Sequence, residues 1–141
     1  MVFSPFQVEE YHIVRIHADM SIVTEPVKIE SQYYAQASSE YSDGKWRGDV
    51  GIGFRYIKTE DEQGIIAEIV INGKFSMAGQ NDDIGKEMFE NRLKINGAST
   101  LIPIARAALA STSAIMGYPN KLTLPNINVK SMKWKEAEEE A

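Results

Sequence analysis

Cysteine is absent from the 141-residue sequence, and histidine occurs only twice, at His12 and His17. Without cysteine the chain has neither a disulfide framework nor thiolate chemistry. A dense cluster of basic residues is also missing: 15 basic residues stand against 20 acidic ones, for a net charge of -5. A nucleic-acid-binding face normally needs such a cluster, so we expect no nucleic-acid partner.

Long apolar runs are missing too. No run approaches the roughly 20 apolar residues that span a bilayer, so we expect no membrane insertion. The N-terminal segment 1–10 is mixed and acidic, unlike the basic and then apolar start of a signal peptide. The expected location is therefore the cytoplasm.

Signals for catalysis or metal binding are sparse. His12 and His17 are expected on opposite faces of a strand, where they cannot converge on one metal ion or nucleophile. The acidic run 80–83 lacks the further spaced oxygens of a calcium loop and fits the first turn of a helix. Gly51 and Gly53 lie inside an alternating strand with no helix behind it, unlike a phosphate loop. We therefore expect no enzymatic activity, no metal site and no cofactor.

The composition that remains fits one globular domain. Apolar residues make up 43% of the chain and charged residues 25%, an ordinary globular balance. The length allows one core and not two. We expect a single domain over residues 1–141, with an N-terminal arm at 1–10 and an acidic tail at 130–141. An acidic surface favours basic partners, including positively charged stretches of unfolded chains.

Four segments alternate between apolar and polar residues with a period of two. This pattern is typical of antiparallel strands with one buried face. The expected buried faces are Val14, Ile16, Ala18, Met20 and Ile22; then Val27, Ile29, Tyr33, Ala35 and Ala37; then Val50, Ile52, Phe54 and Tyr56; and then Ile65, Ala67, Ile69, Ile71, Phe75 and Met77. Turn residues at 42–45 and 60–64 predict hairpin connections.

After Gly79 the spacing of apolar residues becomes helical. It predicts one helix over about 83–95 and a longer one over about 99–116, with a break at Asn96-Gly97. Ser99 or Thr100 can cap the second helix, and Pro103 fits its first turn. A short helix is expected over 131–141.

The second predicted helix is unusually poor in bulky side chains between residues 105 and 114. Small residues let another helix approach closely, so we interpret this stretch as a seam between subunits, represented by Ala105, Ala108, Ser111 and Thr112. The alternative is an alanine-rich helix that faces solvent.

Four segments of the sequence carry recognisable family motifs. E-I-V-I-N-G-K-F-S-M-A-G at 68–79 is followed by L-I-P-I-A-R at 101–106, and Y-P and L-T-L-P fall within 118–125. The segment Y-H-I-V-R-I stands at 11–16. In order and spacing these segments resemble SecB, the bacterial protein-export chaperone family, over about residues 11–129.

The resemblance implies an α+β fold in which a four-stranded antiparallel sheet is backed by two C-terminal helices. It also implies a homotetramer with the long helices at its interface. Members of the family hold unfolded polypeptides in hydrophobic grooves and dock the export motor ATPase on an acidic sheet face. We therefore interpret the protein as a holdase chaperone for unfolded preproteins. The alternatives are a dedicated chaperone of a toxin–antitoxin system, with the antitoxin as client, and a non-chaperone adaptor with the same fold.

Candidate client-binding residues are aromatic and flexible apolar side chains, which suit adaptable hydrophobic surfaces. They are Tyr33, Tyr34, Trp46, Phe75 and Met77. Phe75 and Met77 lie on a predicted apolar face, so a place in the core is the alternative for both. The resemblance suggests Asp19, Ile66 and Glu68 for motor docking, although this acidic pattern is thinner than that of the export chaperones.

Overall fold

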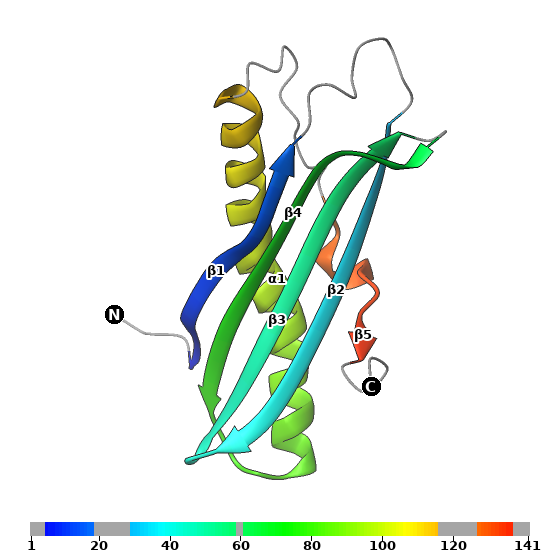
Figure 1. The fold of residues 1–141 in the computed structure, drawn as a ribbon. Coiled ribbons are helices and arrows are strands. Elements are labelled where there is room, and N and C mark those ends of the chain that lie inside the picture. The colour runs from blue at the N-terminus through cyan, green and yellow to red at the C-terminus, as the bar shows by residue number, and fades with distance from the viewer. Residues whose placement is uncertain (1–4, 19–28, 59–60, 116–126, 137–141) are drawn as a thin grey trace.

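The computed structural model describes residues 5–18, 29–58, 61–115 and 127–136. One long helix covers one face of a five-stranded sheet with the strand order β1-β4-β3-β2-β5 (Figure 1). The elements are β1 (Phe6–Ala18), β2 (Ile29–Ser42), β3 (Lys45–Lys58), β4 (Asp61–Ala78), α1 (Asp83–Ile115), the 3-10 turn η2 (Val129–Ser131) and β5 (Lys135–Glu136). Strands β1 to β4 pair antiparallel, and β5 runs parallel to β2. The expected α+β class with four antiparallel strands is confirmed, but α1 is the one α-helix in the described residues, where two were expected.

A tight hairpin joins β2 to β3, as the turn residues predict. Ser42 pairs with Lys45, and both central residues have positive φ, 52° at Asp43 and 78° at Gly44. This is the backbone of a two-residue type I′ turn, whose twist matches that of the flanking strands. Asp and Gly tolerate these angles, so the register of the hairpin follows from local sequence.

The core lies between α1 and the inner face of β3 and β4. Alternate residues of these two strands are buried there, as the period-two pattern predicts. The fully buried large side chains are Val50, Ile52, Ile66, Ile69, Ile71 and Phe75 from the sheet, with Phe89, Leu93, Leu101 and Leu109 from the helix. The helix residues recur at intervals of four and eight, so a single stripe of α1 faces the sheet.

The helix α1 is continuous through the predicted break. It begins after Asp82, whose Oδ1 accepts a hydrogen bond from the Gly85 N–H at 2.7 Å. Thr100 does not cap a second helix: its Oγ1 donates to the Asn96 carbonyl at 2.8 Å, a bond that threonine makes inside helices. Pro103 lies within the helix, on its exposed side.

Close packing explains why α1 contains Gly97. A Cβ atom at this position would lie 3.0 Å from the Val50 Cγ2, closer than ordinary van der Waals contact. The same argument applies on the sheet, where a Cβ on Gly48 would lie 2.6 Å from the Leu93 Cδ2. These glycines let the helix lie against the strands, so Gly97 is not a helix terminator.

Two bulges in β1 change the faces predicted for this strand. One of them is an extra residue at Val14, between Ile13 and Arg15. Beyond it, alternate positions switch sides, because a bulge inserts one residue into the period of two. Ile13 and Ile16 therefore share the helix side of the sheet, and His12 and His17 share the outer face. The prediction that the two histidines lie on opposite faces is wrong for this reason.

Both ends of the chain differ from expectation. The strand β1 begins at Phe6, so residues 6–10 of the predicted arm belong to the sheet. No helix forms over residues 131–136, which instead contain the end of η2 and the strand β5, and residues 137–141 lie outside the described part. No helix in the described stretches is both long and apolar enough to cross a membrane.

Candidate functional site

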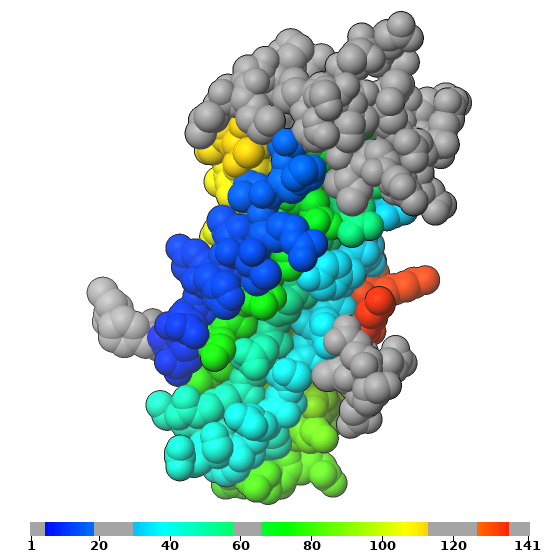
Figure 2. Space-filling view, viewed as in Figure 1, coloured from blue at the N-terminus to red at the C-terminus, as the bar shows by residue number. Residues whose placement is uncertain are grey.

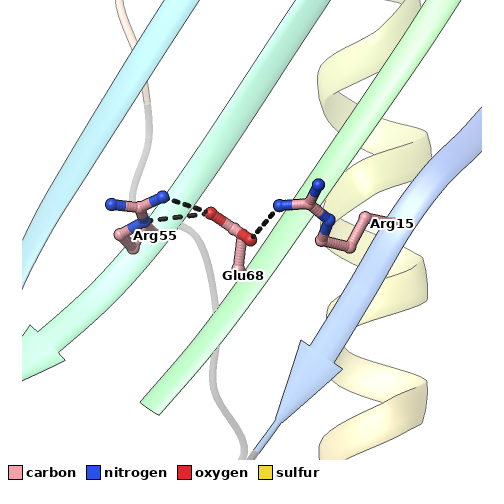
Figure 3. A network of polar contacts seen from close by, with 3 residues as sticks. All are labelled: Arg15, Arg55 and Glu68. Carbon is pink, nitrogen blue, oxygen red and sulfur yellow. Dashed lines mark hydrogen bonds and ion pairs between the residues drawn. The ribbon is translucent and has the colours of Figure 1, made fainter. Parts of the chain in front are cut away.

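The outer face of the sheet, opposite α1, carries a three-residue ion cluster (Figure 3). Glu68 on β4 is 8% exposed and lies between Arg15 on β1 and Arg55 on β3. Arg55 donates from Nε and Nη2 to Glu68 Oε2 at 2.9 and 2.8 Å, and Arg15 donates from Nη1 to Oε1 at 3.2 Å. The cluster links three neighbouring strands and has a net charge of about +1, since two guanidinium groups face one carboxylate.

The charge state of Glu68 follows from these contacts. Burial by itself raises the pKa of its carboxyl. The hydrogen bonds from Arg55 and Arg15 and their positive charges lower this pKa, and together they outweigh the effect of burial. The net result is a pKa below the ordinary value of a glutamate, so Glu68 is ionised at neutral pH. A carboxylate already engaged on both oxygens is a poor acceptor for a cationic partner.

Nearer the β2–β3 turn, the outer face of the sheet is more acidic. A hollow there is lined by Glu9, Glu10, Ser38, Glu40, Arg47, Asp49 and Lys74, among others. Ser76 donates to Glu9, and Lys74 forms an exposed ion pair with Glu10 at 3.6 Å. The charged residues named in the hollow sum to about -2, whereas the Glu68 cluster sums to about +1.

The predicted motor-docking residues do not form one exposed acidic patch. Glu68 is held by two arginines, as described above. Ile66 is 1% exposed and belongs to the core. Asp19 lies outside the described residues.

The five predicted client-binding residues divide into two groups. Trp46, Phe75 and Met77 are buried in the core. Trp46 stacks on Phe89 with ring centroids 6.1 Å apart, and its Nε1 donates to the Gln80 carbonyl at 3.0 Å. These three side chains hold α1 on the sheet, and this places them away from any surface that a client could touch.

Tyr33 and Tyr34 are the exposed pair among these candidates, at 45% and 38%. As neighbours on β2 they point to opposite faces of the sheet. Tyr34 lies on the outer face over Gly53, where a Cβ would come within 2.1 Å of the tyrosine ring. Tyr33 lies on the helix side, and its hydroxyl accepts a hydrogen bond from the Lys133 N–H at 3.0 Å. The structure therefore does not bring the two tyrosines into one groove.

A feature that the sequence analysis missed lies beside Tyr33. The described C-terminal segment 127–136, called the tail segment below, runs between α1 and the free edge of β2 (Figure 1). Met132 is buried in the core, and Ile127, Val129 and Trp134 pack on it in part. The sequence carries a signal for it, two apolar pairs separated by polar residues, but its part from residue 130 onward is predicted as an acidic tail with a short helix.

The predicted oligomer residues lie on different sides of α1. Ala105 is fully buried beneath the helix, so it faces the chain's own sheet. Ser111 is exposed, and Ala108 and Thr112 are half-buried. The small-residue surface available to another molecule is thus formed by Ala107, Ala108, Ser111 and Thr112.

The described residues contain no group of three or more histidine, cysteine, aspartate or glutamate side chains that could hold a metal ion. His12 and His17 pair with residues of β4 that are four positions apart, about 13 Å at strand spacing. They share a face and still cannot meet at one ion.

Two sequence comparisons found no match: no protein-family model fits the chain, and no curated protein resembles it. Solved structures do resemble it. One is the SecB-like chaperone Rv1957 of Mycobacterium tuberculosis, in complex with a ChAD peptide from the Rv1956 HigA1 antitoxin, with a TM-score of 0.57 and 11% identity. The match covers 87% of this chain and 91% of that one. Another is a protein of unknown function from Streptococcus agalactiae, with a TM-score of 0.48 and 14% identity over 86% of this chain and 97% of that one. The first match confirms a SecB-like fold for this chain.

Proposed function

We propose that this protein is a chaperone that binds extended, unfolded segments of other polypeptides. The observation that carries the proposal is the amount of apolar surface left exposed on this fold. Val8, Tyr11, Ile13, Val14 and Ile16 on β1 are 38–52% exposed, and Ile84, Met88 and Ile95 on α1 are 39–73% exposed. A monomer that binds no partner rarely exposes so many large apolar side chains along one strand.

The solved neighbour supports the same class of function. The Mycobacterium tuberculosis chaperone with this fold was captured with a peptide from an antitoxin. A client that buries about 400 Å² of apolar surface gains roughly 10 kcal/mol before the ordering of the chain is subtracted.

The exposed apolar surface also supports an oligomer, and we propose a tetramer. Val8, Tyr11, Ile13 and Ile16 pair with helix-side residues of β4, so they lie on the same side of the sheet as α1. Next to them, the outer surface of the helix carries the small residues at 107–112. A second copy could bury the small-residue surface of the helix and the adjoining part of β1, and the rest of the exposed apolar surface, together with the edge of β2, stays available to clients.

The ion cluster at Glu68 helps to decide between the two proposed kinds of client, exported preproteins and a dedicated client such as an antitoxin. Docking of the export motor in this family uses an acidic sheet face, and Glu68, the predicted docking acid within the described residues, is neutralised here by Arg15 and Arg55. We therefore favour service to a dedicated client, such as an antitoxin, over hand-off to an export motor. Titration of the purified motor ATPase into this protein tests the preference, and micromolar binding would reverse it.

The central test is suppression of aggregation. The protein is mixed with several unrelated chemically unfolded proteins at ratios near one tetramer per client, and light scattering is followed as the denaturant is diluted. A holdase lowers the scattering of more than one client. An adaptor for one folded partner lowers the scattering of no client, and that result would contradict the chaperone proposal in favour of an adaptor.

A further inference from the structure

The tail segment lies on the molecule in the manner of a bound peptide. It is irregular over most of its length, with the three-residue turn η2 and the two-residue strand β5 as its regular parts. It lies next to β2 at the edge of the sheet, and Figure 2 shows it on the surface there, beyond β2. An extended segment that adds a strand to an open sheet edge is one of the common modes of peptide recognition.

Its contacts with the rest of the molecule are of two kinds. The first is apolar: Met132 enters the core, and Trp134 packs on the core in part. The second is made by the backbone, through the pairing of β5 with β2 and the bond from the Lys133 N–H to Tyr33. Neither kind depends strongly on side-chain identity, since any extended segment with apolar residues at similar spacing can make both.

The edge of β2 offers more than the tail segment uses. The strand has 14 residues, and β5 pairs with Gln36 and Ala37 alone. On either side of these two residues, no other part of the described chain pairs with this edge of β2. A longer extended segment could therefore gain backbone hydrogen bonds that the tail segment does not make.

The composition of the tail segment matches the expected chemistry of a client. Lys130, Lys133 and Lys135 alternate with its apolar residues, whereas the whole chain carries a net charge of -5. A basic, apolar segment is what an acidic chaperone attracts from an unfolded chain.

We propose that the tail segment occupies the client site, and that a basic, apolar segment of an unfolded client displaces it from β2. This inference rests on the proposed chaperone function and adds to it a site and an internal competitor. The competitor sets the affinity: if the tail segment holds the site about nine-tenths of the time, clients bind about tenfold more weakly than to the open site.

A reversible cross-link tests the competition directly, because the chain has no cysteine of its own. Gln36 and Lys135 are partners in the pairing of β2 with β5, and neither side chain is buried. Neighbouring strands bring Cα atoms within the range that a disulfide accepts. The double variant Q36C/K135C therefore locks the tail segment when oxidised and frees it when reduced.

The probe is fluorescently labelled ribonuclease A that has been reduced and carbamidomethylated, so that it stays unfolded and basic. Binding is measured by anisotropy for the double variant in both redox states, with K135C alone as the matched control. We expect the oxidised double variant to bind at least tenfold more weakly than its reduced form, while K135C binds equally in both states. Equal binding by the two forms of the double variant, with the cross-link verified by mass, would overturn the competition.

A second variant tests the same idea without a cross-link. Trp134→Ser weakens the apolar hold of the tail segment while leaving the buried Met132 in place, and we expect up to about tenfold tighter binding of the probe. Unchanged or weaker binding contradicts the proposal. Failure of the chaperone function and failure of the competition give different results. If the wild-type protein neither binds the probe nor suppresses aggregation, the proposed chaperone function is wrong. If the wild-type protein and all variants bind the probe equally, only the competition is wrong.

Discussion

Glu68 alternates with the core residues of β4, so its position predicts an exposed side chain, but the structure buries it. Its carboxylate is nearly buried on the outer face of the sheet, and it receives three hydrogen bonds from two arginines. Both arginine side chains remain well exposed, at 63% and 43%. The cluster therefore ties three strands together through one acid.

This arrangement predicts a pH-dependent stability. The pKa of Glu68 is lowered in the folded state, so the carboxylate stabilises the fold above its unfolded pKa of about 4.3, and this contribution is lost as the pH falls through the folded value. Glu68→Gln should lower the free energy of unfolding at pH 7 by about 1–3 kcal/mol, with a smaller difference at pH 3. Urea unfolding at both pH values measures this.

Glu10→Gln is the matched control, because Glu10 and Lys74 form a pair in which both side chains are more than half exposed. Such a pair contributes little to stability. An equal loss from E68Q at pH 7 and pH 3 would contradict the role assigned to the ionised carboxylate.

Trp46 and Tyr34 show what sequence reasoning at single positions can and cannot reach. The residue type alone predicts client binding for both. The alternation along each strand shows which residues share a face of the sheet. It does not show which face α1 covers, because that depends on contacts between residues far apart in the sequence. The bulge at Val14 is a similar case, since nothing local to the first strand predicts where an extra residue is inserted.

Substitution of these two aromatic residues should therefore have different effects. Trp46→Ala removes a side chain that is 4% exposed and stacked on Phe89, and it should cost about 3–5 kcal/mol of stability. Tyr34→Ala removes an exposed ring and should cost about 1 kcal/mol or less. Thermal unfolding of both variants is the measurement, and a mild W46A phenotype would argue against the core assignment.

At the scale of elements, the helix is where local signals and tertiary contacts disagree. Asn96-Gly97 predicts a break, with Pro103 in the first turn of a second helix, and yet α1 continues through both. Gly97 fits within the helix because the absence of a side chain lets the helix approach Val50. Pro103 has no backbone N–H to donate to the preceding turn, and it lies on the exposed side of the helix. The strands and the β2–β3 turn were predictable because their signals are local and agree with the final fold.

The close approach at Gly97 can be tested by filling it. Gly97→Val should overpack the contact with Val50 and lower stability by about 1–3 kcal/mol. Asn91→Val is the control on an exposed part of the same helix, and there valine has only its small intrinsic effect on helix stability. If both variants unfold at the same urea concentration, the glycine is not needed for packing.

For the whole molecule, the proposed tetramer makes a prediction about size. Ser111→Phe places a large ring on the exposed small-residue surface of α1 and should shift the assembly towards smaller species without unfolding the subunit. Light scattering together with circular dichroism measures mass and fold on the same sample. A wild-type protein that is monomeric at micromolar concentration would contradict the tetramer, and an unchanged mass for S111F would exclude this surface as the interface.

The strand order has a consequence for how the chain is made. The strand β1 leaves the ribosome first, but its partner β4 is complete only at residue 78, after the β2–β3 hairpin has emerged. The hairpin needs contacts between neighbours in sequence alone, whereas β1 must close a loop of more than 40 residues before it pairs, and such distant pairings form slowly. During that delay β1 has no paired strand, and newly made chains can meet through its open edge and its apolar residues. The proposed chaperone thus passes through a stage in which its own first strand needs the protection that the proposal has it give to others.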